Sequence, residues 1–148
     1  MKIADVRVRE VSVPRIYDTY SADPRRLQSA DDPGRSRYQI VELYADDGRV
    51  GLGEVSDIAD RMCPLAAEEL RDLLKEEVGG GDVEEWRALF ARVAAALPEE
   101  YHPELRGLTL FGAEIALLDL VGKRFGVPLY ELLGGRCRER VEVCWVGF

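Results

Sequence analysis

The segment GAEIALLDLVGKRFGVPLYELLGG, residues Gly112 to Gly135, decides how this chain folds. Its first half has a helical pattern with only four polar side chains, Glu114, Asp119, Lys123 and Arg124. A helix with so few polar positions packs against neighbours on more than one side. It is too short and too charged to cross a bilayer, so it predicts a buried helix of a globular domain. Asp119 and Lys123 are four residues apart and are expected to form a structural ion pair.

The second half of this segment predicts how the helix ends. Gly126 follows the last helical residues, where glycine adopts the left-handed conformation that closes a helix. Pro128 stands at the expected first position of a short second helix over residues 129–133. Gly134-Gly135 is expected to end that second helix.

Upstream of this segment, the sequence predicts three strands and then two helices. Hydrophobic periodicity and turn residues predict strands at Lys2–Val13, Tyr38–Ala45 and Arg49–Val55, and helices at Pro64–Val78 and Asp82–Pro98. Asp82 and Glu85 are expected to form a capping box at the start of the latter helix. A loop is predicted at Glu99–Gly107, and a last strand, after Gly135, at Glu139–Trp145. Asp46-Asp47-Gly48 is typical of a hairpin turn. Strands first and helices afterwards predict an α+β fold, in which a three-stranded antiparallel meander packs against three main helices.

Two finer predictions concern the strands. The apolar residues of Lys2–Val13 change from even to odd positions after Val8, so a β-bulge is expected near Arg9-Glu10. Gly51 and Gly53 fall on one face of the third strand and leave room there for a close neighbour.

Composition favours a single globular domain. The chain has 148 residues, of which 47% are hydrophobic and 32% charged, and a net charge of −8. That negative charge argues against nucleic acid or an anionic membrane as a partner. The start MKIADVRVRE carries charges where a secretion signal needs an apolar run, and the 3 cysteines form no CxxC pair. A cytoplasmic location is therefore expected.

Two segments carry a resemblance to a known family. GAEIALLDLVGKRFGVPLYELLGG resembles the last helix and exit turn of the N-terminal capping domain in the enolase superfamily, in its mandelate racemase and muconate-lactonising enzyme branch. DDGRVGLGEVS, at Asp46–Ser56, resembles the DGxxGxGE hairpin of the same family. In that family the exit turn leads into the first strand of a (β/α)8 barrel. The resemblance implies a capping domain over residues 1–135, followed by a linker and a first barrel strand over residues 136–148.

The resemblance also implies a chemistry, that of a racemase, dehydratase or cycloisomerase. In such enzymes Mg²⁺ holds the carboxylate of a small substrate while a Lys or His base removes the adjacent proton. The metal ligands and bases of the family lie on later barrel strands. Only 148 − 135 = 13 residues follow Gly135, whereas a barrel takes roughly 250. No catalytic residue and no metal ligand are therefore expected in this chain. It is expected to be inactive without its barrel domain, and to belong to a homo-oligomer.

The capping loops of the family contact the distal end of the substrate and exclude water. By position they fall on the irregular segment Arg15–Arg37 and on Ser56–Asp60. Arginine pairs well with carboxylates and tyrosine with hydroxyl groups. The candidate substrate contacts are Tyr17, Tyr20, Arg25, Arg26, Ser56 and Asp57. The alternative is that these are solvated loop residues. Glu54, which ends the GLGE match, is expected to form a local salt bridge or cap a backbone amide.

Two other functions remain open at this point. One is a free-standing α+β binding or dimerisation module that has the capping fold without catalysis. The other is a small enzyme that uses loop acids such as Asp57 and Asp60. The sequence does not distinguish among the substrate classes of the superfamily.

The predicted last strand leads to a prediction about association. Val141, Val143, Trp145 and Phe148 would expose apolar side chains and unpaired backbone, and such edges promote self-association. We therefore expect light scattering to show less association for a version that ends at Gly135 than for the whole chain. Equal association of the two would reject the idea.

Overall fold

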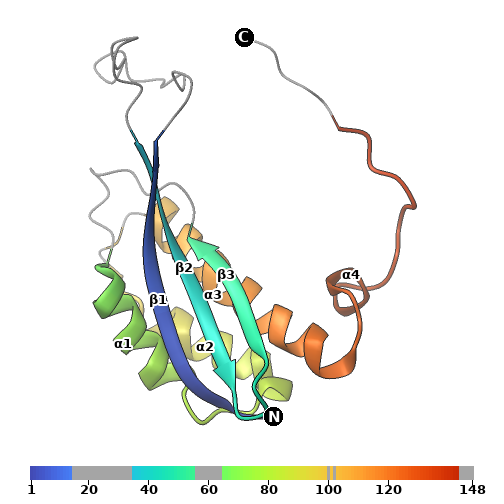
Figure 1. Cartoon of the computed structure of the whole chain (residues 1–148), viewed down its shortest axis with the longest axis horizontal. Helices are drawn as coiled ribbons and strands as arrows, with labels where there is room; N and C mark the ends of the chain where they lie inside the picture. Colours follow the sequence, from blue (N-terminus) through green and yellow to red (C-terminus); the bar gives the residue numbers. More distant parts are fainter. Residues whose placement is uncertain (15–34, 56–64, 100, 102, 144–148) are drawn as a thin grey trace.

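The computed structural model describes residues 1–14, 35–55, 65–99, 101 and 103–143, and confirms the predicted α+β fold (Figure 1). Three strands come first and the helices follow. The elements are β1 (Ile3–Pro14), β2 (Arg35–Ala45), β3 (Val50–Val55), α1 (Ala67–Val78), the 3-10 turn η3 (Val83–Glu85), α2 (Trp86–Ala96), α3 (Pro103–Phe125) and α4 (Leu129–Leu132).

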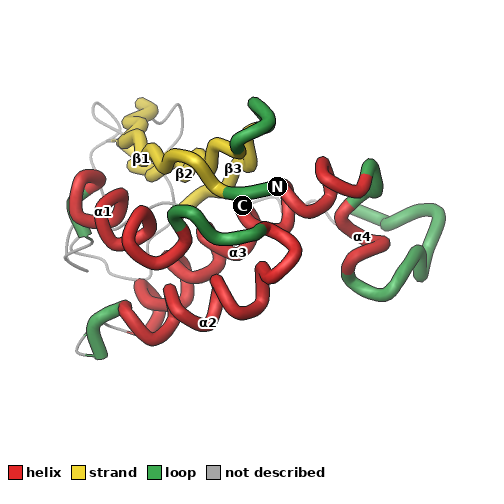
Figure 2. Tube along the Cα trace, turned by 90° about the horizontal axis from the view of Figure 1, so that it is seen from below, coloured by secondary structure: helices red, strands yellow, loops and turns green. Residues whose placement is uncertain are grey.

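The strands form one antiparallel sheet in the order β1-β2-β3. The predicted hairpin joins β2 to β3: Gly48 has a φ of +88°, which favours glycine, and the Ala45 amide donates to the Arg49 carbonyl at 2.8 Å. All the main helices lie on one side of this sheet, so the molecule has two layers (Figure 2). The core between the layers is aliphatic and includes Val6, Val41, Leu43, Leu70, Leu74, Leu89, Val93, Leu117 and Leu120.

The predicted bulge near Arg9-Glu10 is wrong. The register of β1 against β2 is continuous there, and the irregularity lies between Ile3 and Asp5. Val11 and Val13 are 40% and 45% exposed. Their odd positions place them on the face of the sheet that the helices do not cover, so the change in apolar phase reflects a change of face without any extra residue.

The predicted close approach at Gly51 and Gly53 is confirmed, and α3 is the neighbour. A Cβ atom on Gly53 would overlap the carbonyl oxygen of Gly112, and one on Gly51 would lie 2.6 Å from the Leu120 Cγ atom. The contact is reciprocal, since a Cβ atom on Gly112 would lie 3.0 Å from the Glu54 carbonyl oxygen. The backbones of α3 and β3 therefore touch with no side chain between them.

Helix α3 begins earlier than predicted. Residues 103–107, assigned from the sequence to a loop, form its first turn, and Pro103 suits this place because it lacks the amide hydrogen that a first turn leaves unpaired. Leu105 is 1% exposed and Thr109 is 5% exposed, so burial of one helix face outweighs the helical cost of Gly107.

The starts of α1 and α2 also differ from prediction in detail. At α1 the Glu69 carboxylate accepts a hydrogen bond from the Ala66 amide at 2.9 Å, so the cap lies inside the predicted helix. The helix predicted at Asp82–Pro98 is divided into η3 and α2, and the Asp82 carboxylate caps η3 by accepting from the Glu84 amide at 3.1 Å, instead of forming a capping box with Glu85. This bond lowers the pKa of Asp82.

The end of the chain confirms the predicted turns but not the predicted strand. Gly126 has a φ of +67°, and Gly134 and Gly135 have φ values of +110° and +95°. Residues 139–143 form no strand and lie apart from the sheet (Figure 1). Val141 and Val143 are 76% and 90% exposed, as expected, because no other strand is beside them to complete a ladder. The remainder of the predicted strand, with Trp145 and Phe148, lies outside the described residues.

The backbone contact predicts opposite effects for two glycine substitutions. Gly53→Ala forces a methyl group into the Gly112 carbonyl and should lower the free energy of unfolding by about 1–3 kcal/mol. Gly107→Ala is the matched control: it lies in α3 with open space around it, and should raise that free energy by about 0.5–1 kcal/mol. Urea unfolding measures both. A Gly53→Ala variant as stable as the unmodified chain would contradict the close contact.

Candidate functional site

The substrate contacts predicted from the sequence, Tyr17, Tyr20, Arg25, Arg26, Ser56 and Asp57, lie outside the described residues. The structure does show where their two segments begin and end. Pro14, the last residue of β1, pairs with Arg35, the first of β2. Val55, the last residue of β3, pairs with Gln39 of β2. Both segments therefore start from the end of the sheet opposite the 46–48 turn.

The root of the segment 56–64 is held on both sides by Gln39. Its backbone pairs with Val55, which precedes the segment, and its side-chain Nε2 donates to the carbonyl of Leu65, which follows it, at 2.7 Å. Gln39 is only 2% exposed. A buried amide that makes such a bond is costly to replace, because its partner would be left unsatisfied.

The root of the segment 15–34 is closed by arginines. Arg35 donates from Nε to the hydroxyl of Ser12 at 2.7 Å and from Nη2 to the Ser12 carbonyl at 2.8 Å. Arg37 forms an ion pair with Glu10 at 2.9 Å. These contacts hold the far ends of β1 and β2 together where the segment leaves the sheet.

The uncovered face of the sheet carries a chain of polar contacts. Glu42 accepts from the Tyr44 hydroxyl at 2.9 Å and pairs with Arg9 at 3.1 Å. The Glu42 charge raises the pKa of the Arg9 guanidinium. Arg7 stacks over the Tyr44 ring, 4.6 Å from its centroid. Glu54 is exposed on β3, and within the described part of the chain its carboxylate forms neither the salt bridge nor the cap expected from the sequence.

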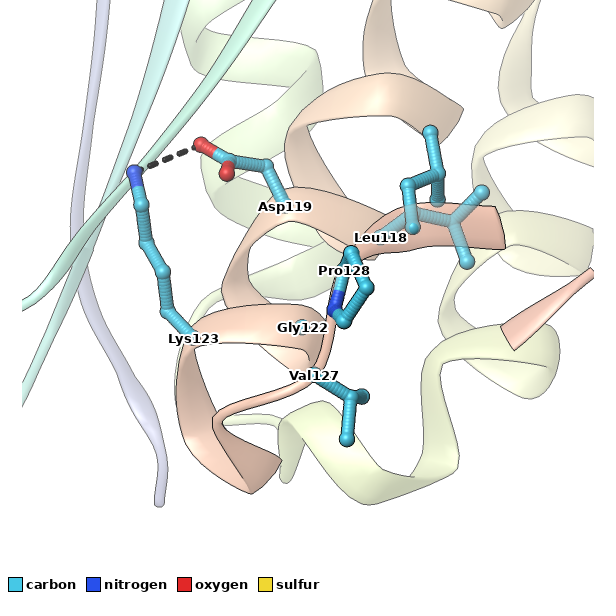
Figure 3. A pocket seen from close by; sticks show the side chains of 7 residues that line it. Leu118, Asp119, Gly122, Lys123, Val127 and Pro128 are labelled. Carbon is cyan, nitrogen blue, oxygen red and sulfur yellow. Dashed lines mark hydrogen bonds and ion pairs between the residues drawn. The ribbon is translucent and has the colours of Figure 1, made fainter. Parts of the chain in front are cut away.

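The predicted pair of Asp119 and Lys123 is confirmed at 2.7 Å, and it reaches beyond its own helix. Asp119 also accepts from the Leu52 amide at 2.8 Å, and Lys123 donates to the Val50 carbonyl at 2.6 Å. The pair borders a hollow of about 190 Å³ between α3 and the start of α4 (Figure 3). The hollow is lined by Leu118, Asp119, Gly122, Lys123, Val127, Pro128 and Leu129.

Sequence reasoning missed two structural residues, Gln39 and Arg106. Arg106, on α3, donates to the carbonyls of Leu97 at 2.5 Å and Pro98 at 3.3 Å, and also to that of Ala94. These carbonyls end α2 and have no partner within that helix, so a cation there is favourable. Neither role has a local signal, because each depends on how separate elements cross.

The described residues do not fit a metal site. Among them, no group of three or more His, Cys, Asp or Glu side chains converges. Mg²⁺ takes oxygen ligands in a near-ideal octahedron and needs such convergence. In the same part of the chain, no helix combines the length and hydrophobicity needed to cross a membrane.

The family of this chain follows from comparison with known proteins. Residues 18–134 match the family described as mandelate racemase / muconate lactonizing enzyme, N-terminal domain. The chain belongs to this family. The resemblance of its two glycine-containing segments is thereby confirmed, and the chain represents an N-terminal capping domain of the enolase superfamily.

Similar proteins catalyse several reactions. Muconate cycloisomerase 1-1 from Acinetobacter lwoffii is 31% identical over 88% of this chain and 34% of that protein. D-galactonate dehydratase from Variovorax paradoxus is 34% identical over 75% of this chain and 28% of that protein. L-Ala-D/L-Glu epimerase from Clostridium acetobutylicum is 25% identical over 91% of this chain and 35% of that protein. The chain spans about a third of the length of these relatives.

Solved structures show the same fold. A muconate cycloisomerase from Azorhizobium caulinodans aligns with a TM-score of 0.68 at 26% identity, over 95% of this chain and 32% of that one. A mandelate racemase/muconate lactonizing protein from Herpetosiphon aurantiacus also aligns with a TM-score of 0.68, at 20% identity, over 90% of this chain and 34% of that one.

The absence of convergent acids among the described residues gives a prediction for metal binding. We expect isothermal titration of the chain with Mg²⁺ to show no stoichiometric binding. An Asp57→Asn/Asp60→Asn variant, titrated in parallel, should give the same flat response. Tight 1:1 binding that this variant loses would contradict the expectation and favour the small-enzyme hypothesis.

Proposed function

We propose that this chain is the substrate-specificity cap of an enzyme that removes a proton next to the carboxylate of a small substrate. The reaction would be a racemisation, an acid-sugar dehydration or a cycloisomerisation, with Mg²⁺ in the full-length enzyme. The observation that supports this most is the family match over residues 18–134 together with the shared fold. The names of the relatives cover cycloisomerase, dehydratase and epimerase activities.

The chain alone is proposed to be inactive. Its described residues bring no set of acids together that suits the metal, so the metal ligands and the base would belong to a following barrel domain. In this proposal residues 1–135 form the cap, and residues 136–148 are the linker and first barrel strand. The 3 cysteines, an odd number without a CxxC pair, fit a reducing cytoplasm.

An apolar surface on α3 and α4 is proposed to pack against the barrel. Phe111, Leu118 and Phe125 follow one another at intervals of seven residues and so lie on one side of α3, with Leu118 only 5% exposed between the two phenylalanines. Phe111 and Phe125 are more than half exposed, at 57% and 54%. Leu118 lines the same hollow as Leu129 of α4, which is 41% exposed. Exposed apolar groups gathered in this way mark an interaction surface.

Substrate contact is proposed for the six loop residues Tyr17, Tyr20, Arg25, Arg26, Ser56 and Asp57. Support comes from the roots of their segments, which leave the same end of the sheet and are anchored there by Gln39 and Arg35. Binding residues often lie on loops that a rigid scaffold positions, and these two roots belong to such a scaffold. Arginine and tyrosine side chains would then bind carboxylate and hydroxyl groups of the ligand.

The alternative is a binding or dimerisation module without catalysis. The uncovered face of the sheet favours it, because the exposed Val11, Val13 and Leu52 lie there beside charged groups. A homo-oligomer is proposed under either function. The two proposals differ in what the chain does when a barrel is attached.

A fusion to a barrel tests the capping function. The chain would replace the matching third of muconate cycloisomerase 1-1 from Acinetobacter lwoffii. We expect the fusion, but not the chain alone, to turn over a small carboxylate when Mg²⁺ is present. Arg25→Ala and Tyr17→Phe should raise KM about tenfold or more, with circular dichroism unchanged. Turnover by the chain alone would refute the proposed inactivity.

The same fusion tests the docking surface. Phe125→Asp/Leu129→Asp should lower the melting temperature and the activity of the fusion, because two charges would be buried at the interface. Val11→Asp/Val13→Asp is the matched control, since it also adds two charges at similarly exposed positions but on the uncovered face of the sheet. Equal effects of the two changes would contradict docking through α3 and α4.

A further inference from the structure

The outer edge of β3 is bonded by side chains of α3. In the order β1-β2-β3, β3 is an outer strand, and an outer strand presents unpaired backbone groups that invite another strand. Here two charged side chains of α3 bond two of these groups. Asp119 Oδ2 accepts from the Leu52 amide at 2.8 Å, and Lys123 Nζ donates to the Val50 carbonyl at 2.6 Å.

The two side chains supply the groups that a neighbouring strand would supply. Along an antiparallel strand, the backbone groups of successive residues point alternately to the two neighbouring strands. Val50 and Leu52 are two residues apart, so their backbone groups point to the same side. The carboxylate takes the place of a strand carbonyl and the ammonium takes the place of a strand amide. Their own ion pair at 2.7 Å holds donor and acceptor together (Figure 3).

We propose that Asp119 and Lys123 form an edge clamp, which occupies the Leu52 amide and the Val50 carbonyl in place of a fourth strand and closes this edge to strand addition. The occupant that the clamp excludes is β3 of a second copy of this chain. The proposal does not depend on the capping function, because it concerns only contacts within residues 50–55 and α3.

The composition of β3 explains why a second copy would pair there. Its sequence VGLGEV has one charge, and Leu52 is 49% exposed beside the edge. Antiparallel pairing of two β3 strands about Leu52 would bring two leucine side chains together on one face, which stabilises a strand pair. The other outer strand, β1, carries Arg7, Arg9 and Glu10, and charges on an edge strand disfavour such pairing.

The opposite edge of the sheet, strand β1, also has contacts to its backbone. At the start of β1, the Ile3 amide donates to the Gly81 carbonyl at 3.0 Å, and the Gly80 amide donates to the Ile3 carbonyl at 2.8 Å. Asp5 of β1 pairs with Lys75 of α1 at 3.4 Å. The Asp5–Lys75 pair joins a helix to a strand, as Asp119–Lys123 does. In the described part of the chain the Lys75 ammonium bonds only the Asp5 carboxylate, whereas Lys123 also donates to a strand carbonyl. A hydrogen bond from the Val6 amide lowers the pKa of Asp5.

A charge-neutral double substitution tests the clamp. Asp119→Ala/Lys123→Ala removes one charge of each sign, so the net charge stays at −8. The matched control is Asp5→Ala/Lys75→Ala, which also removes a helix-to-strand ion pair without changing the net charge. Sedimentation velocity over a hundredfold concentration range measures association, and hydrogen exchange measures the Leu52 amide.

We expect the clamp variant to associate at concentrations at least tenfold lower than the control and the unmodified chain. Its Leu52 amide should exchange at least tenfold faster than in the control at the lowest concentration. A folded clamp variant that associates no more than the control would overturn the proposal.

Two further measurements test the proposal if the double variant does not fold. Lys123→Met keeps the aliphatic stem and removes the bond to Val50 together with the ion pair to Asp119. Lys75→Met, which removes the ion pair to Asp5 and changes the net charge equally, is its control, and the same difference in association is expected. In the unmodified chain, the Leu52 amide should exchange at least tenfold more slowly than an unprotected peptide amide. An unprotected Leu52 amide would overturn the clamp without any substitution.

Discussion

Backbone contact between α3 and β3 is the constraint on which the rest of the structure depends. Because Gly51, Gly53 and Gly112 carry no side chains, the helix axis lies as close to the sheet as the main chain allows. This closeness brings Ala116 and Leu120 of α3 into the core at 0% exposure. It also explains why side chains one and two turns further along α3 can reach the edge of the strand.

The helix that makes this contact also organises the second layer. Arg106, near the start of α3, binds the carbonyls that end α2. At the other end of α3, Leu118 and Gly122 line a hollow together with the chain that leads into α4. One helix thus contacts the sheet, its neighbouring helix and the exit from the domain. A change in its tilt would be felt at all three places, because packed interiors transmit strain.

Much of this arrangement can be predicted from the sequence. The hairpin at Asp46-Asp47-Gly48, the two glycines of β3 and the closing turn at Gly126 each depend on a local requirement that few residues meet. The burial of α3 on more than one side follows from its scarcity of polar residues, and the α+β order follows from periodicity. The substrate-contact residues stay predictions, since they lie outside the described residues.

Other features depend on contacts between distant segments and could not be predicted. The phase change in β1 resembled a bulge because a single sequence does not say which face of a strand is covered. The first turn of α3 looked like a loop, since burial of Leu105 is a tertiary effect. The segment at 139–143 alternates like a strand, but alternation does not supply a partner. The role of Gln39 depends on Leu65, 26 residues away, so no local pattern indicates it.

The contacts of Gln39 bear on how freely the sequence and length of residues 56–64 can vary. By joining Val55 to Leu65, Gln39 makes the residues on either side of the segment 56–64 neighbours whatever residues lie between them. The entropy of closing a loop grows only slowly with its length, about 0.6 kcal/mol for each doubling. Insertions, deletions and exchanges of residues 56–64 therefore cost the domain little, and new ligand preferences can evolve there without a new scaffold.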